Sequence, residues 1–245
     1  MIKYKQIKEE GFCITDIKIE ENLFNKCKST FNDIIQKPNL HKIRNANFTV
    51  IAHPYIYDCF AAIPTLDEIL EIPQAFFEGR EFFLGTENLR RSIATGAKEG
   101  TTTIYHRDNN NLLQGDTEGN FLKVFLYLTD VGEKNGPFTY VRKSNINAKQ
   151  QRTIEGSYRL SDNAVFSHYN KEEEIKFIAP QNTVIAADTT GLHKGTKVVQ
   201  GHRDLLTMNF CTSKENDTEK QKVNSSFIDS LPQDKRDLFR FHSKQ

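Results

Sequence analysis

Two histidines and one aspartate in this chain are residues of the types that together bind a transition metal. His106 and Asp108 are separated by one residue, and His193 follows in a turn flanked by glycines. In an extended segment alternate side chains point the same way, so His106 and Asp108 can share one metal ion while the residue between them faces elsewhere. Two imidazoles and one carboxylate form the facial triad that holds Fe(II) and leaves the opposite coordination positions open. The pattern predicts an oxygenase.

An arginine follows the second histidine at the start of a further apolar run. Residues 183–187 predict a buried strand before His193, and Arg203 precedes a second predicted strand at 204–211. A guanidinium can clamp a carboxylate through two parallel charge-assisted hydrogen bonds, which a lysine does less specifically. Fe(II) together with a dicarboxylate held by Arg203 indicates 2-oxoglutarate as the cosubstrate.

Three stretches of the chain, residues 105–108, 121–138 and 188–206, resemble the phytanoyl-CoA dioxygenase family of Fe(II)/2-oxoglutarate oxygenases. The resemblance implies a mainly β fold, a double-stranded β-helix (a cupin-like jelly roll) with flanking N-terminal helices and the iron at its open end. It also implies that His106, Asp108 and His193 are the catalytic iron ligands, that Arg203 binds 2-oxoglutarate, and that O2 is the second cosubstrate. Succinate and CO2 would be released as the substrate is hydroxylated.

Two details qualify the resemblance. Related halogenases have a small residue where Asp108 stands, so the carboxylate at this position favours hydroxylation over halogenation. The chain departs from the family pattern at residues 142–145, where relatives often carry a Pro-Gly-Ser-His turn. This departure concerns the geometry of that loop and leaves the metal site unaffected.

A lysine stands on an otherwise apolar predicted strand, 122–129. Lys123 shares a face with Phe125 and Tyr127 by the period of two, and these two aromatic residues are predicted to form an apolar wall for the substrate. A buried lysine usually has an anionic partner. Lys123 is therefore a candidate to hold the carboxylate of 2-oxoglutarate or of the substrate, and the alternative is a lysine that extends to water at a sheet edge.

Two further candidates lie on one face of the predicted strand before the His-Arg-Asp triplet. Resembling enzymes place polar contacts to cosubstrate and substrate there, so Thr95 is a candidate for the cosubstrate and Arg91 for the substrate. The alternative for both is a strand face exposed to solvent. Thr196, close behind His193, is interpreted as a turn residue, and the alternative is that it reaches the 2-oxoglutarate.

Two other functions fit the same residues. One is a non-catalytic jelly-roll protein, a ligand binder or sensor, which the loss of a ligand or of Arg203 would favour; none of them is missing. The other is a zinc hydrolase, because three protein ligands and a water are also a catalytic zinc arrangement. Arg203 argues against the hydrolase.

The composition predicts one domain, residues 1–245, in a chain of 28.2 kDa. The net charge is +1, with 33 basic and 32 acidic residues, so no nucleic acid or membrane partner is expected. The sequence does not determine the oligomeric state. No run approaches the about 20 apolar residues of a membrane span, and no apolar signal core begins the chain, so the expected location is cytoplasmic. Four cysteines without a C-x-x-C pair predict buried thiols.

The expected substrate is a small molecule that is polar or anionic. The motivation is a set of basic residues on strands or loops predicted near the mouth of the barrel: Arg91, Lys98, Lys123, Arg142 and Lys143. The alternative is that these charges only make the surface soluble.

The periodicity of apolar residues predicts the elements that position these residues. A helix is expected at 19–36, and a second at 65–77 with Thr65 as its N-cap. A weaker helical pattern covers 232–242 and suggests a lid or an edge cover. Strands are predicted at 89–95, 102–107, 122–129, 138–141, 174–177, 183–187 and 204–211.

Overall fold

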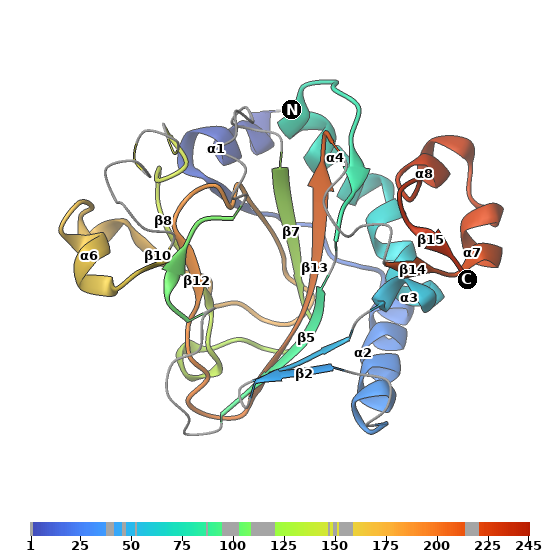
Figure 1. Ribbon diagram of the computed structural model, residues 1–245, viewed down its shortest axis with the longest axis horizontal. Coiled ribbons are helices and arrows are strands. Elements are labelled where there is room, and N and C mark those ends of the chain that lie inside the picture. The colour runs from blue at the N-terminus through green and yellow to red at the C-terminus, as the bar shows by residue number, and fades with distance from the viewer. Residues whose placement is uncertain are drawn as a thin grey trace.

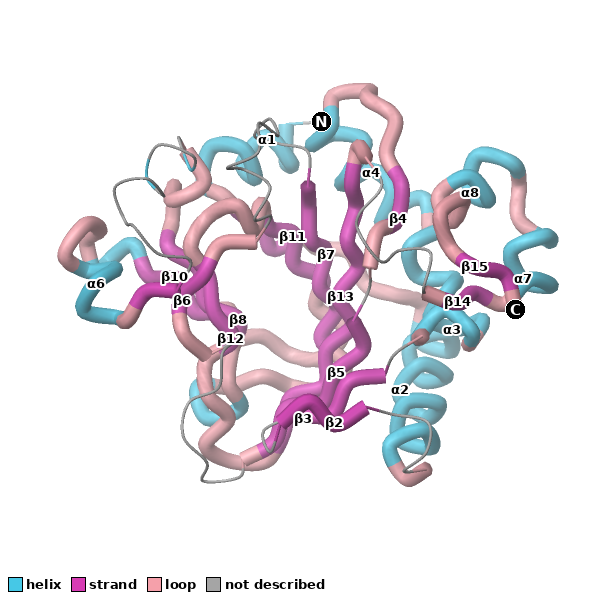
Figure 2. The backbone as a smooth tube through the Cα atoms, viewed as in Figure 1, coloured by secondary structure: helices cyan, strands magenta, loops and turns pink. Residues whose placement is uncertain are grey.

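Two antiparallel sheets form the body of the protein, and helices gather on the outer side of the larger one (Figures 1 and 2). The computed structural model describes residues 2–37, 42–45, 48–51, 53–86, 88–94, 103–108, 121–146, 148, 151, 159–213 and 221–245. Within these residues the larger sheet runs in the order β1-β11-β7-β13-β5-β3-β2, with β4 paired to β13, and the smaller runs β10-β8-β12-β6-β9. The double-stranded β-helix predicted from the resemblance is confirmed.

The strands of the larger sheet are β1 (Phe12–Ile14), β2 (Lys42–Asn45), β3 (Phe48–Ile51), β4 (Phe83–Leu84), β5 (Asn88–Ile93), β7 (Phe121–Tyr127), β11 (Val184–Ala187) and β13 (His202–Cys211). Those of the smaller sheet are β6 (Tyr105–His106), β8 (Phe138–Val141), β9 (Arg159–Leu160), β10 (Glu174–Lys176) and β12 (His193–Gly195). A parallel pair, β14 (Lys222–Val223) and β15 (Ser243–Lys244), lies apart from both.

Alternation along the strands sorts the apolar residues into two cores. On β7, Val124 and Leu126 pack in the cluster beneath the helices, whereas Phe125 and Tyr127 pack in the cluster between the sheets. The same alternation on β13 assigns Leu205 to the cluster between the sheets. The inner face of the larger sheet therefore looks across the barrel at the smaller sheet.

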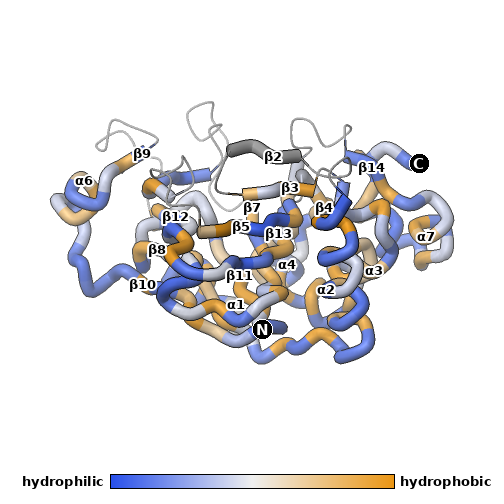
Figure 3. The backbone as a smooth tube through the Cα atoms, turned by 90° about the horizontal axis from the view of Figure 1, so that it is seen from below, coloured by the Kyte–Doolittle hydropathy of each residue, from blue (hydrophilic) through white to orange (hydrophobic). Residues whose placement is uncertain are grey.

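The helices are α1 (Ile2–Glu10), α2 (Glu21–Ile35), α3 (Asp58–Ala62), α4 (Asp67–Phe77), α6 (Asp162–Phe166), α7 (Ser225–Ser230) and α8 (Gln233–Asp237), with short 3-10 turns η2 (Pro54–Ile56), η3 (Ile63–Thr65), η5 (Glu133–Asn135) and η6 (Lys171–Glu173). Hydrophobic and hydrophilic residues alternate along α2 (Figure 3), and Phe24, Cys27, Phe31 and Ile34 are its buried face. The carboxylate of Glu20 caps this helix by accepting hydrogen bonds from the backbone N–H groups of Asn22 and Leu23.

Most predicted elements are present, with shifted ends. The helix expected at 19–36 is α2, and the strand expected at 138–141 is β8. The prediction of Thr65 as an N-cap is wrong, because its hydroxyl donates to the carbonyl of Ala62 at 2.8 Å and α4 begins two residues later. The helix α1 was not expected. The segment from 221 to 245 packs against the outer side, where Phe239 meets Tyr55 and Phe241 meets Phe83, so it covers an edge.

Candidate metal centre

The two histidines of the predicted triad are brought together by strand pairing. His193 on β12 lies directly opposite His106 on β6, and their ring centroids are 4.3 Å apart. Asp108 follows β6, and its Oδ2 lies 3.2 Å from Nε2 of His193. One ligand atom from each of the three residues lies within 4.8 Å of the others, so the three could hold a single metal ion.

Each imidazole is oriented by a backbone carbonyl. Nδ1 of His106 lies 2.9 Å from the carbonyl oxygen of Ile104, and Nδ1 of His193 lies 2.9 Å from that of Gly191. A proton on Nδ1 donates to each carbonyl, which leaves the Nε2 lone pair for a metal. Burial, and then the neighbouring imidazole of His193, lower the pKa of His106 to about 4. The imidazole of His106 is therefore neutral near pH 7, as a metal ligand must be.

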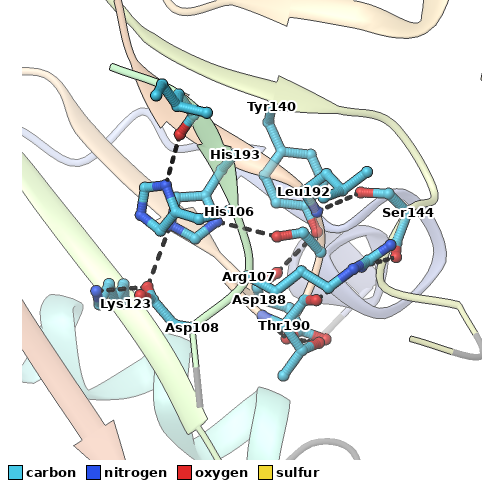
Figure 4. Close-up of polar contacts among 12 residues, drawn as sticks. His106, Arg107, Asp108, Lys123, Tyr140, Ser144, Asp188, Thr190, Leu192 and His193 are labelled. Carbon is cyan, nitrogen blue, oxygen red and sulfur yellow. Dashed lines mark hydrogen bonds and ion pairs between the residues drawn. The ribbon is translucent and has the colours of Figure 1, made fainter. Parts of the chain in front are cut away.

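The residue between His106 and Asp108 ties the two ligand-bearing segments together (Figure 4). The guanidinium of Arg107 is buried and donates to the carbonyls of Ser144 at 2.6 Å and Thr190 at 2.8 Å. It also donates to the hydroxyl of Tyr169 at 3.0 Å. The backbone N–H of Asp108 donates to the carbonyl of Thr189 at 2.8 Å. Arg107 therefore joins the segment of the first two ligands to the turn that carries His193.

That turn is itself built around a buried carboxylate. Oδ1 of Asp188 accepts hydrogen bonds from the backbone N–H and the hydroxyl of Thr190, at 3.1 and 2.6 Å. The hydroxyl of Ser144 accepts from the backbone N–H of Leu192 at 2.7 Å, and the amide of Asn145 donates to Oδ2 of Asp188 at 3.4 Å. The loop at 142–145, where the chain departs from the family pattern, thus still supports the turn of the third ligand.

Lys123 lies at the metal site. Its ammonium contacts Oδ2 of Asp108 at 2.5 Å (Figure 4). Burial alone would raise the pKa of Asp108, but the charges of Lys123 and His193 outweigh burial and hold this pKa well below its usual value. The anionic partner expected for a half-buried lysine is thus Asp108 itself.

Arg203 is buried at the N-terminal end of β13, on the inner face of the larger sheet. One of its terminal nitrogens donates to the carbonyl of Gly136, and its Nε is buried without a hydrogen-bond partner. Among the described residues no carboxylate forms an ion pair with Arg203, and burial lowers its pKa. A Cβ at position 195 would stand 3.0 Å from a terminal nitrogen of Arg203, so glycine leaves the room that the guanidinium occupies. Ser92 and Thr196 line a pocket beside it.

A family model described as Phytanoyl-CoA dioxygenase (PhyH) matches residues 26–182, a stretch that contains His106 and Asp108. The chain belongs to the phytanoyl-CoA dioxygenase family. As a member of it, the protein is an Fe(II)- and 2-oxoglutarate-dependent dioxygenase, with O2 as the second cosubstrate. Among curated protein sequences none matches this chain.

Solved structures similar to this PhyH-family chain cover more of it than the family match does. HygX from Streptomyces hygroscopicus, solved with nickel and 2-oxoglutarate bound, is 14% identical over 89% of this chain and 91% of its own, with a TM-score of 0.64. EctD from S. alaskensis, solved with 2-oxoglutarate and 5-hydroxyectoine, is 11% identical over 86% of this chain and 75% of its own, with a TM-score of 0.61. At such identities the likeness is one of fold.

The residues predicted to contact substrate in this PhyH-family protein divide between the two faces of the larger sheet. Phe125 faces inward, with its ring centroid 4.6 Å from that of Phe138, which in turn lies 5.7 Å from the ring of His193. Tyr127 also faces inward, but it is fully buried, and its hydroxyl donates to the carbonyl of Phe177 and accepts from the N–H of Phe138. Tyr127 therefore joins the two sheets, and its expected place in the substrate wall is corrected to a place in the core.

The predicted substrate contact of Arg91 is also corrected. Arg91 lies opposite Asp204, and its guanidinium binds both oxygens of that carboxylate, at 2.8 and 2.6 Å. It also donates to Asn32 of α2 and lies over the ring of Phe31. Arg91 thus points to the outer face, beneath the helices, because the alternation of β5 turns Arg90 and Ser92 inward instead. Thr95 and Lys98 lie outside the described residues.

Thr196 lies beside Arg203, whereas the remaining basic candidates that the structure describes lie at the end of α1. The hydroxyl of Thr196 shares a hydrogen bond with that of Thr139 at 2.8 Å, and Thr196 lines the pocket that Arg203 also lines. Arg142 and Lys143 pair with Glu10 at the end of α1.

Within the described residues, no helix is long and apolar enough to cross a membrane.

Proposed function

We propose that this dioxygenase hydroxylates a small polar molecule, with Fe(II) held by His106, Asp108 and His193 and the distal carboxylate of 2-oxoglutarate held by Arg203. The observation that carries the proposal is Arg203. A buried guanidinium without a carboxylate partner among the described residues is costly, and a dicarboxylate cosubstrate would supply that partner. The glycine at 195 keeps space open beside it.

The donor set fits Fe(II) and the cosubstrate. When bound, the metal and 2-oxoglutarate supply the oxidising chemistry that inserts an oxygen atom into a C–H bond of the substrate. The protein supplies two neutral imidazoles and one carboxylate on one face, and the apolar side chains of Phe125 and Phe138 shield the site from water. Asp108 fills the position that halogenases leave open for chloride, which supports hydroxylation.

The likeness in fold supports a small and polar substrate. HygX has been solved with hygromycin B bound, and EctD with 5-hydroxyectoine, and both of these ligands are polar small molecules. At 14% and 11% identity, the likeness supports only the class of substrate, a small polar molecule.

The deciding experiment is succinate formation by purified protein with Fe(II), 2-oxoglutarate and ascorbate. Uncoupled turnover releases succinate even without the substrate, so activity that depends on Fe(II) and O2 supports the proposal. Metal and 2-oxoglutarate binding without succinate would favour the non-catalytic binding protein. Ester or amide hydrolysis with Zn²⁺ in the absence of O2 would favour the hydrolase.

A further inference from the structure

The inner face of the larger sheet changes from apolar to polar toward the metal residues. Lys123 on β7 lies directly opposite Asn209 on β13, and Thr207 on β13 lies opposite Asn88 on β5. Because Thr207 and Asn209 have the same parity on β13 as Leu205, which packs between the sheets, all four side chains stand on the inner face. We call these four residues the polar strip.

The polar strip adjoins the metal centre. The ammonium of Lys123 contacts Asp108 at 2.5 Å, and directly opposite side chains on neighbouring strands have Cβ atoms about 4.5–5.5 Å apart. Asn209 is therefore one side chain away from the aspartate of the triad. Asn88 lies diagonally across from Asn209 on the next strand, so one small molecule could reach both amides.

Two hydrogen-bond acceptors in the polar strip, the side-chain oxygens of its two asparagines, have no donor. The amide of Asn209 is 7% exposed and donates to the hydroxyl of Thr86 at 3.4 Å, which leaves its Oδ1 buried without a hydrogen-bond partner. Oδ1 of Asn88 is also buried without a partner. Buried polar atoms in native proteins nearly always have a partner, so two unmet oxygens on one wall need an explanation.

The cations near the polar strip are already engaged. Lys123 is paired with Asp108, and the guanidinium of Arg90, which also faces inward, lies 4.7 Å from the centroid of the Phe48 ring. The buried atoms of the strip that lack a hydrogen-bond partner are therefore two amide oxygens, which accept hydrogen bonds. A complementary ligand must bring donors, which hydroxyl and amino groups do and carboxylates do not.

We infer that Asn88 and Asn209 are the substrate-recognition residues of this enzyme, and that they accept hydrogen bonds from a polyhydroxylated or amino-bearing small molecule of the cyclitol or sugar class. The inference rests on the proposed function and narrows its substrate. Both oxygens are shielded from water in this conformation, so the side chains that cover them must move to admit the ligand. A hydrogen bond formed in such a shielded place discriminates strongly against a ligand that cannot donate.

The test measures binding to protein loaded with Ni(II) and 2-oxoglutarate, by isothermal titration calorimetry, so that it does not depend on turnover. Four probes are compared: myo-inositol, 2-deoxystreptamine, cyclohexanecarboxylate and cyclohexanol. We expect myo-inositol or 2-deoxystreptamine to bind at least about tenfold more tightly than cyclohexanecarboxylate, which has no donor, and cyclohexanol, which has one. Tighter binding of either of the last two probes, or no binding of the first two, overturns the inference.

The variants assign the binding to the two amides. Asn209→Leu and Asn88→Leu should each weaken the better probe about tenfold, whereas the matched control Asn163→Leu, exposed on α6, should not. If the leucine variants bind the probe with the dissociation constant of the wild type, the side-chain oxygens of Asn88 and Asn209 do not contact it, and the inference fails.

A conservative variant covers the case in which the leucine variants do not fold. Asn209→Asp keeps the shape and the acceptor while adding a negative charge. It should raise the preference for 2-deoxystreptamine over cyclohexanecarboxylate by about tenfold, and an unchanged preference contradicts the inference. Succinate release by the wild type is measured alongside. Its absence would refute the proposed function, whereas its presence without selective probe binding would refute only the substrate class.

Discussion

Replacing Arg203 by methionine should separate cosubstrate binding from stability. The guanidinium is buried, has no carboxylate partner among the described residues, and makes one hydrogen bond, to the carbonyl of Gly136. Methionine fills a similar volume without charge. Because the removed charge is unpaired in the absence of ligand, we expect the free energy of unfolding of Arg203→Met without 2-oxoglutarate to be unchanged or higher.

The same substitution should abolish tight binding of 2-oxoglutarate. Truncating one partner of a buried, hydrogen-bonded charge pair costs about 2 to 5 kcal/mol, which corresponds to a rise in the dissociation constant of about 30- to 4000-fold. Arg203→Lys keeps the charge but loses the two-pronged geometry, so its constant should lie between those of the wild type and Arg203→Met.

Calorimetry of 2-oxoglutarate binding to the Ni(II)-loaded protein measures the dissociation constant, and denaturant unfolding measures the free energy of unfolding. Lys37→Met, at an exposed position after α2, is the control and should change neither beyond about 0.5 kcal/mol. If Arg203→Met binds 2-oxoglutarate as tightly as the wild type does, the reasoning is refuted. Lys123 and then Lys197, which lines the same pocket as Arg203, would be examined next.

Four other changes test the site and its supports. Alanine at His106, Asp108 or His193 should abolish succinate formation and Ni(II) binding while leaving a folded protein, and normal turnover by His193→Ala would sink the ligand assignment. Arg107→Met leaves two carbonyls and a phenol without their donor, so the free energy of unfolding should fall by about 3 kcal/mol and metal affinity by about 10- to 100-fold; unchanged metal affinity would mean that Arg107 does not position the ligands. With chloride present, mass spectra of the product should show a gain of one oxygen, and a chlorinated product would contradict the role of Asp108. Glu20→Ala removes the cap of α2 and should lower the free energy of unfolding measured in denaturant without changing metal affinity.

The strand pattern and the ligand types were predictable because each depends on neighbours in the sequence. The period of two places His106 and Asp108 on one side and Arg107 on the other, whatever the rest of the chain does. The apolar runs at 138–141 and 183–187 likewise match β8 and β11 within one residue. Helix α2 followed from its own apolar periodicity. Local rules of this kind decide an element's existence and the faces of its side chains.

Local rules do not decide which face of a strand turns inward. The sequence grouped Arg91 with the site because Arg91 precedes the His-Arg-Asp triplet on a neighbouring strand. In the structure Asp204 on β13 and the ring of Phe31 on α2 hold Arg91 on the outer face. A choice between the two faces of β5 depends on what covers the sheet, and those residues lie far away in the chain.

The sequence by itself determined that two histidines, an aspartate and an arginine were available for iron and 2-oxoglutarate, and that strands would carry them. Only the tertiary structure decided that Lys123 pairs with Asp108, that Arg107 holds the turn of His193, and that Asn88 and Asn209 share one wall. The physical reason is that such partners meet through the register between strands and through buried hydrogen bonds over long sequence separations. Register is fixed by the packing of the whole barrel and by its many buried side chains together, so no single segment encodes it.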